Sequence, residues 1–169
     1  KVSDMSVVFG YNADTAGKLH NTFLQLSGAM PLDQAEELSA KMQYMLGSMA
    51  EAHGIAPGIV AKDLVENSEF LAKNFAGMPE EAMRAAVEVR RLGYSLGQAA
   101  KVSDHLFDIQ GSLTAQMEAS VGLGRSVDMN AARRYAMTGE TAKMMEELSK
   151  QMGTYTDFQN LSVAQRMLL

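Results

Sequence analysis

The chain has 169 residues, of which 47% are hydrophobic, and its formal net charge at neutral pH is −5. This length can bury one substantial core, or two small ones, without stabilising cross-links. The absence of cysteine excludes disulfides and thiolate chemistry. No apolar run approaches the roughly 18 residues that span a bilayer. The acidic balance argues against nonspecific binding to duplex DNA, which depends on lysine and arginine.

Nearly every segment has the periodicity of an amphipathic helix, and only residues 5–9 have the β-branched and aromatic density of a strand. Asn12 and Ser95 are expected N-caps, because their side chains can accept backbone N–H groups, while Pro31 and Pro79 suit helix entries. Helices are expected over residues 13–26, 32–53, 57–65, 79–91, 129–136 and 140–151, with others starting after Asn67 or Ser68, after Ser95, and running through Met117 and Glu118. The pattern predicts an all-α fold, a multi-helix bundle of about eight to ten helices.

The longest expected helix, residues 32–53, has apolar residues at alternating steps of three and four. This spacing is typical of a seam that packs against other helices in a bundle. A Met45→Asp substitution in a buried seam is expected to cost several kcal/mol. The seam residues are Ala35, Leu38, Met42, Met45, Met49 and Ala52.

The helix after Ser95 is expected to have an equally clear inner face. In the helix after Ser95, five apolar residues are predicted to face inward and Asp104 and Asp108 outward; Asp128 is predicted to cap the helix at 129–136. The chain has fourteen methionines and no tryptophan, which indicates a core of flexible side chains or, alternatively, an adaptable groove for a partner helix. The inward residues after Ser95 are Leu96, Ala99, Ala100, Leu106 and Phe107.

The chain is interpreted as a single helical domain, residues 1–169, of a longer polypeptide, since it begins with Lys1 and stops within an amphipathic pattern. An internal similarity links Gly10-Tyr11-Asn12 to Gly93-Tyr94-Ser95 at an offset of 83, which is 93 minus 10. It predicts two similar helical halves, residues 10–92 and 93–169. The signals that helix starts and ends commonly share explain the similarity about as easily as duplication does.

No group of residues in the sequence indicates catalysis. His20, His53 and His105 fall in separate expected helices without a metal-ligand motif. The glycine-rich run at residues 122–126 lacks the spacing of a phosphate-binding loop and is interpreted as a turn. The doublets at residues 90–91 and 133–134 are interpreted as solvated helix faces rather than nucleic-acid patches. We therefore predict no enzymatic activity and no catalytic, cofactor-binding or metal-binding residue.

Three stretches of the chain resemble a segment of the tail tape measure proteins of large tailed bacteriophages. The resemblance lies in helix order and in phrases such as LGYSLGQAAKVSDHLFD, EASVGLGRSVDMNAARR and EELSKQMG. It implies a structural virion component that lines the tail tube, sets tail length, and is assembled in the host cytoplasm. Such proteins are usually far longer, so this chain corresponds to one domain of them.

The resemblance also implies self-association and binding to tail tube or tail tip proteins. We predict Tyr135, Met137 and Phe158 as protein-contact residues, although burial in the core explains these residues equally well. We predict no sequence-specific nucleic-acid binding, no cofactor and no membrane segment. The alternative is a cellular interaction module that captures an amphipathic peptide in a methionine-lined groove.

Overall fold

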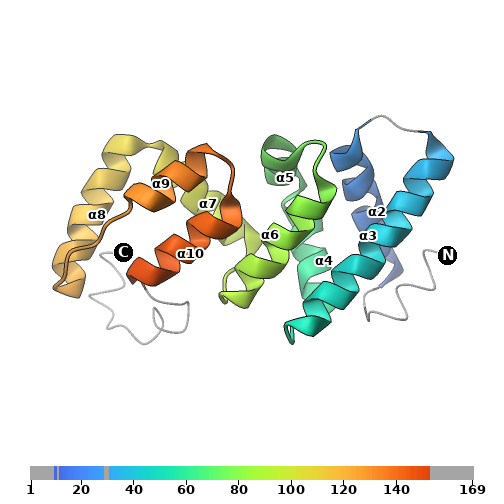
Figure 1. The fold of residues 1–169 in the computed structure, drawn as a ribbon, viewed down its shortest axis with the longest axis horizontal. Helices are drawn as coiled ribbons and strands as arrows, with labels where there is room; N and C mark the ends of the chain where they lie inside the picture. The colour runs from blue at the N-terminus through green and yellow to red at the C-terminus, as the bar shows by residue number, and fades with distance from the viewer. Residues whose placement is uncertain (1–9, 11, 29–30, 153–169) are drawn as a thin grey trace. The chain divides into compact units, whose positions relative to one another are not determined.

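The computed structural model describes residues 10, 12–28 and 31–152, and these residues form nine α-helices and no strand (Figure 1). The prediction of an all-α multi-helix fold is confirmed. The strand considered at residues 5–9 and the predicted contact residue Phe158 lie outside the described residues. The chain divides into two compact units, Lys1–Arg91 and Leu92–Leu169.

In the first unit, helix α2 packs against each of the other four helices. The side chain of Asn12 caps α2 as predicted, accepting the Thr15 N–H at 2.8 Å, and Gly28 ends the helix with φ of 77°, which favours glycine. Leu19 and Phe23 are fully buried at its centre. The unit contains α2 (Ala13–Ser27), α3 (Leu32–Ala52), α4 (Pro57–Glu66), α5 (Ser68–Phe75) and α6 (Pro79–Arg91).

The inner face of α3 differs from the predicted seam. Met45 is only half-buried and Ala52 is exposed, whereas Leu46 is completely buried. The polar residues Ser39 and Gln43 are also buried, and the Gln43 Nε2 donates to the Ser39 Oγ at 3.2 Å. The apolar pattern misses this face because two polar residues pair with each other inside it. The buried positions are Ala35, Ser39, Met42, Gln43, Leu46, Gly47 and Ala50.

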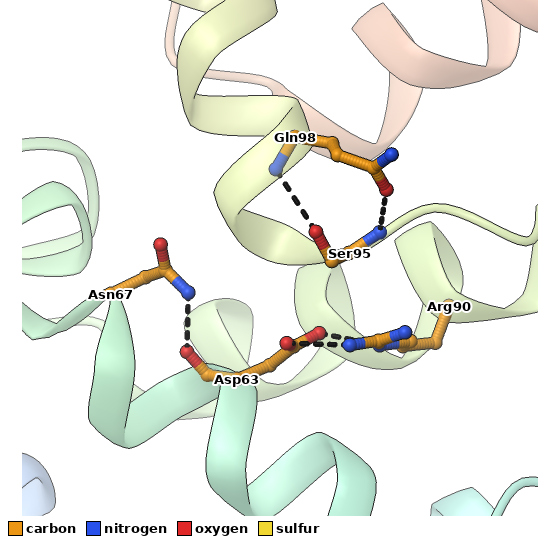
Figure 2. A network of polar contacts seen from close by, with 5 residues as sticks. All are labelled: Asp63, Asn67, Arg90, Ser95 and Gln98. Carbon is orange, nitrogen blue, oxygen red and sulfur yellow. Dashed lines mark hydrogen bonds and ion pairs between the residues drawn. The ribbon is translucent and has the colours of Figure 1, made fainter.

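An ion pair joins α4 to α6 within the first unit (Figure 2). Arg90 Nε lies 2.5 Å from Asp63 Oδ2, and Arg90 Nη2 lies 2.7 Å from Asp63 Oδ1. The Asp63 side chain is 5% exposed and that of Arg90 27%. Asn67, considered as a cap for α5, instead donates from its Nδ2 to the Asp63 carbonyl at 2.8 Å. The two-pronged guanidinium contact compensates a carboxylate that has lost most of its water.

The second unit is built around α7, which packs against the three helices that follow it. Ser95 caps α7 as predicted: Ser95 Oγ accepts the Gln98 N–H at 3.1 Å, and Gln98 Oε1 accepts the Ser95 N–H at 2.7 Å (Figure 2). This reciprocal pair satisfies donors at the helix start. The helices are α7 (Leu96–Phe107), α8 (Ile109–Leu123), α9 (Asn130–Met137) and α10 (Thr141–Met152).

A break at Asp108 separates α7 from α8. The Asp108 Oδ1 accepts the Gly111 N–H at 3.0 Å, so the residue predicted to face outward from one helix caps the next. A Cβ at Gly111 would collide with this carboxylate, and glycine therefore leaves the space that the cap needs. Phe107, predicted to face inward, is 51% exposed beside this break.

The connection from α8 to α9 confirms the glycine turn in part, because Gly122 and Leu123 belong to α8 and the turn begins at Gly124. Gly124 adopts φ of 63° and its N–H reaches the Val121 carbonyl at 3.2 Å, which ends α8. The predicted cap at Asp128 is displaced: α9 has Met129 at its N-cap position without a side-chain cap bond. Asp128 Oδ1 instead accepts the Asn130 N–H at 2.9 Å. The carboxylate still satisfies a donor at the helix entry.

Candidate protein-contact surfaces of the second unit

Two of the three predicted contact residues are described, and both belong to α9. Tyr135 is half-buried, with the Arg134 guanidinium carbon 5.4 Å and the Lys143 Nζ 5.6 Å from its ring centroid. Met137 is 55% exposed. Residues two positions apart point to nearly opposite sides of a helix, so Tyr135 and Met137 do not form one continuous patch.

Arg133 forms a buried polar cluster that joins α9 to α8. Its side chain donates from Nε to the Ser112 Oγ at 2.8 Å, from Nη2 to the Ser112 carbonyl at 3.0 Å and to the Gln116 Oε1 at 2.8 Å, and from Nη1 to the Asn130 Oδ1 at 3.0 Å. The residue is only 6% exposed. All four acceptors are neutral, so hydrogen bonds rather than a carboxylate hold this charge. The interpretation of residues 133–134 as a solvated face is wrong for Arg133.

The other basic doublet is also engaged in ion pairs. Arg90 pairs with Asp63, as described above, and the Arg91 Nε lies 2.7 Å from the Glu88 Oε2. Arg91 is exposed, in agreement with a solvated helix face. Each arginine of this doublet therefore has a carboxylate partner within the first unit.

We expect Arg133→Met to loosen α8 because the change removes all four hydrogen bonds that the guanidinium donates. The buried oxygens of Ser112 and Gln116 would lose partners, at a cost of about 2–4 kcal/mol in the free energy of unfolding of the second unit. Faster amide hydrogen exchange in α8 and α9 would show the effect. Arg134→Met, at the exposed neighbouring position, is the matched control, and equal effects of both changes would contradict the assignment.

A groove of about 360 Å³ lies among α7, α8 and α10. Ser112 and Gln116, both bound by Arg133, supply polar groups to its lining, and the Arg133 cluster therefore positions one wall of the groove. His105 and Asp108 also line it. The apolar lining includes Leu106, Ala119, Met129, Leu148 and Met152.

Helix α8 also carries an apolar stripe that was not predicted from the sequence, formed by Ile109, Leu113, Met117 and Val121. The side chains are exposed, although each is large and hydrophobic. The signal was their uniform spacing of four residues, which places them along one ridge of a helix. We call this set the α8 stripe.

Charged side chains in the connection between α9 and α10 and on α10 itself interact at the surface. Glu140 accepts hydrogen bonds from Lys143 and Thr138, which lower the pKa of its carboxyl group. The hydrogen bond that Lys143 donates to Glu140 raises the pKa of Lys143. The Glu140 contribution to stability is therefore present above the ordinary glutamate pKa and is lost as pH falls. The Lys143 contribution is present below the ordinary lysine pKa and is lost as pH rises. The hydrogen bonds that Lys150 donates to Glu147 and Glu146 likewise raise the pKa of Lys150.

The histidines are found in different settings. The His20 Nδ1 is buried and has no hydrogen-bond partner among the described residues, and the His53 Nε2 lies 4.0 Å from the Glu88 Oε1. No cluster of three or more histidine, aspartate or glutamate side chains in the described part of the chain could hold a metal ion. Over the same residues, no helix has the length and apolar character needed to cross a membrane.

Comparison with known proteins identifies no relative. No protein-family model, curated protein sequence or solved structure matches the chain. The class that the described residues define is an all-α protein of two helical units.

Proposed function

We propose that the chain is a domain of a bacteriophage tail tape measure protein and acts in tail assembly and tail-length determination through helix-mediated contacts. The resemblance of residues 51–75, 85–120 and 112–161 to that family supports the proposal. The described part of the last stretch, residues 112–152, forms most of α8 and all of α9 and α10. The observation that carries it is the α8 stripe. A helix that turns large apolar side chains outward is suited to packing against another protein surface.

The expected partners are other copies of the chain and tail tube or tail tip proteins, and the expected location is the lumen of the virion tail. Tyr135 and Met137 of α9, with Phe158 outside the described residues, remain predicted contact residues. Their role is separable from that of the α8 stripe, because they belong to another helix.

An in-frame deletion of these 169 residues in a phage that encodes them tests the proposal. The deletion should shorten the tails, because the family that the chain resembles sets tail length through the length of its own chain. Electron microscopy of purified particles would measure the length, and mass spectrometry would show whether the undeleted chain is present in virions.

The matched control for this deletion replaces the segment with an unrelated helical sequence of equal length, which should restore tail length. Unchanged tail length after deletion, or absence of the chain from virions, would contradict the proposal.

The groove favours a second candidate function, the capture of an amphipathic peptide by a cellular interaction module. Two methionines, Met129 and Met152, line the groove, and such side chains adapt to varied apolar partners. Neighbouring genes for tube, baseplate and capsid proteins would support the tail function. Their absence, together with saturable binding of an amphipathic helical peptide that protects α7 and α10 from hydrogen exchange, would support the alternative.

A further inference from the structure

Helix α8 turns four of its five large apolar side chains outward, while the fifth, Leu123, packs against the core of the second unit. Ser112 and Ala119 are the buried residues of this helix, whereas the α8 stripe is 43–80% exposed, from Ile109 at 43% to Val121 at 80%. The stripe extends about 18 Å along the helix, at about 1.5 Å per residue. Contact with the rest of the second unit therefore leaves the more hydrophobic ridge of α8 in water.

The charge of α8 restricts what can cover this ridge. Glu118 is the one charged residue between Ile109 and Leu123, and the helix has no lysine or arginine. Nucleic acids and anionic membrane surfaces bind through such cations, and neither would find one here. The complementary partner is another apolar ridge with few charges.

A second copy of the chain supplies such a ridge. The stripe advances by four residues at every step, and two ridges of this type interdigitate when helices cross at about −50°. Two chains that each carry a net charge of −5 repel over most of their surfaces. At the α8 stripe two copies would bring no like charges together at the centre of the contact. The carboxylate of Glu118 lies about 100° around the helix from Met117 and so outside the stripe.

We propose that the α8 stripe is the contact between copies of this chain, with Leu113 and Met117 at the crossing point and Ile109 and Val121 at its ends. The inference rests on the proposed function, which supplies several copies side by side. One helix crossing buries less than the roughly 800 Å² per partner of a standard interface. Association of the isolated chain is therefore weak, and several copies held close together strengthen it.

Cross-linking of the purified full chain tests this contact, and the natural absence of cysteine makes single-cysteine variants unambiguous. Leu113→Cys and Met117→Cys should each form dimers with a short bismaleimide, in a manner that depends on protein concentration. Glu118→Cys, exposed on the same helix but outside the stripe, is the control. Equal cross-linking of all three variants would overturn the proposal.

Sedimentation velocity gives an independent readout. Met117→Glu should raise the dimer dissociation constant by at least about tenfold, because it places a charge in the apolar contact. Met78→Glu, at a methionine that is 48% exposed in the first unit, should leave the constant unchanged. Circular dichroism checks that both variants fold. A wild-type chain that stays monomeric at millimolar concentration contradicts the contact.

The two proposals can fail separately. If virions contain the chain and its deletion shortens the tails, but the purified chain gives no stripe-specific cross-link, the tail function is retained and the α8 contact is rejected. Stripe-specific dimers of a chain that is absent from virions would retain the contact and remove the tail function.

Discussion

A Leu46→Asp substitution should destabilise the first unit more than the same change at Met45. Leu46 is completely buried, so an aspartate there would either carry an unpaired charge away from water or be protonated, which requires its pKa to rise above the usual value. We expect a cost of at least about 4 kcal/mol in the free energy of unfolding, which corresponds to a fall of about 15 °C or more in Tm. Thermal melting followed by circular dichroism would measure it.

Met45→Asp and Ser48→Asp complete this series on one helix. Met45 is half-buried and Ser48 is exposed, so the expected costs are about 1–2 kcal/mol and close to zero, respectively. Hydrogen exchange in α2 to α6 would assign the loss to the first unit. A larger loss of stability at Met45 than at Leu46 would support the buried seam predicted from the sequence and contradict the inner face of α3 in the structure.

Removing Arg90 should have the second large effect. Arg90→Met leaves the buried Asp63 carboxylate without its guanidinium, and the expected cost is about 3–5 kcal/mol. Asp63→Asn should cost less, because the Arg90 side chain is 27% exposed and can keep water around its charge. Urea denaturation of the two variants, followed by circular dichroism, would establish this order.

The double variant Asp63→Leu/Arg90→Met distinguishes a buried-charge effect from loss of packing. With no charge left to bury, it should be more stable than Arg90→Met alone. If the double variant is the least stable of the set, packing by the arginine stem rather than charge compensation holds α4 to α6. Added salt should change the pair little, since buried charges are poorly screened.

Helix boundaries could be predicted well because their signals are local. Asn12 and Ser95 cap the helices that follow them, Gly28 ends α2, and Gly124 ends α8. A cap depends on a side chain and a backbone N–H two or three residues away, so neighbouring residues suffice to predict it. Asp108 shows the limit of such prediction. It caps α8 because one helix ends and another begins at this residue, and hydrophobic periodicity does not indicate that interruption.

The candidate surfaces were predicted less well, for a physical reason. Periodicity identifies the apolar side of a helix, but only the neighbouring helices determine which part of that side is covered. Met117 and Val121 have the spacing of core residues, yet they are exposed because Ser112 and Ala119 occupy the packed face. Arg133 shows the converse, since a charged residue is buried where Ser112 and Gln116 from another helix accept its hydrogen bonds.

The all-helical class, the approximate helix limits and the lack of cysteine chemistry were set by amino-acid types and their spacing along the chain. The inner face of α3, the Asp63–Arg90 pair, the Arg133 cluster and the exposed α8 stripe depend on residues brought together across tens of positions. Local steric and hydrogen-bonding preferences determine the former, whereas packing and desolvation among separate helices decide the latter.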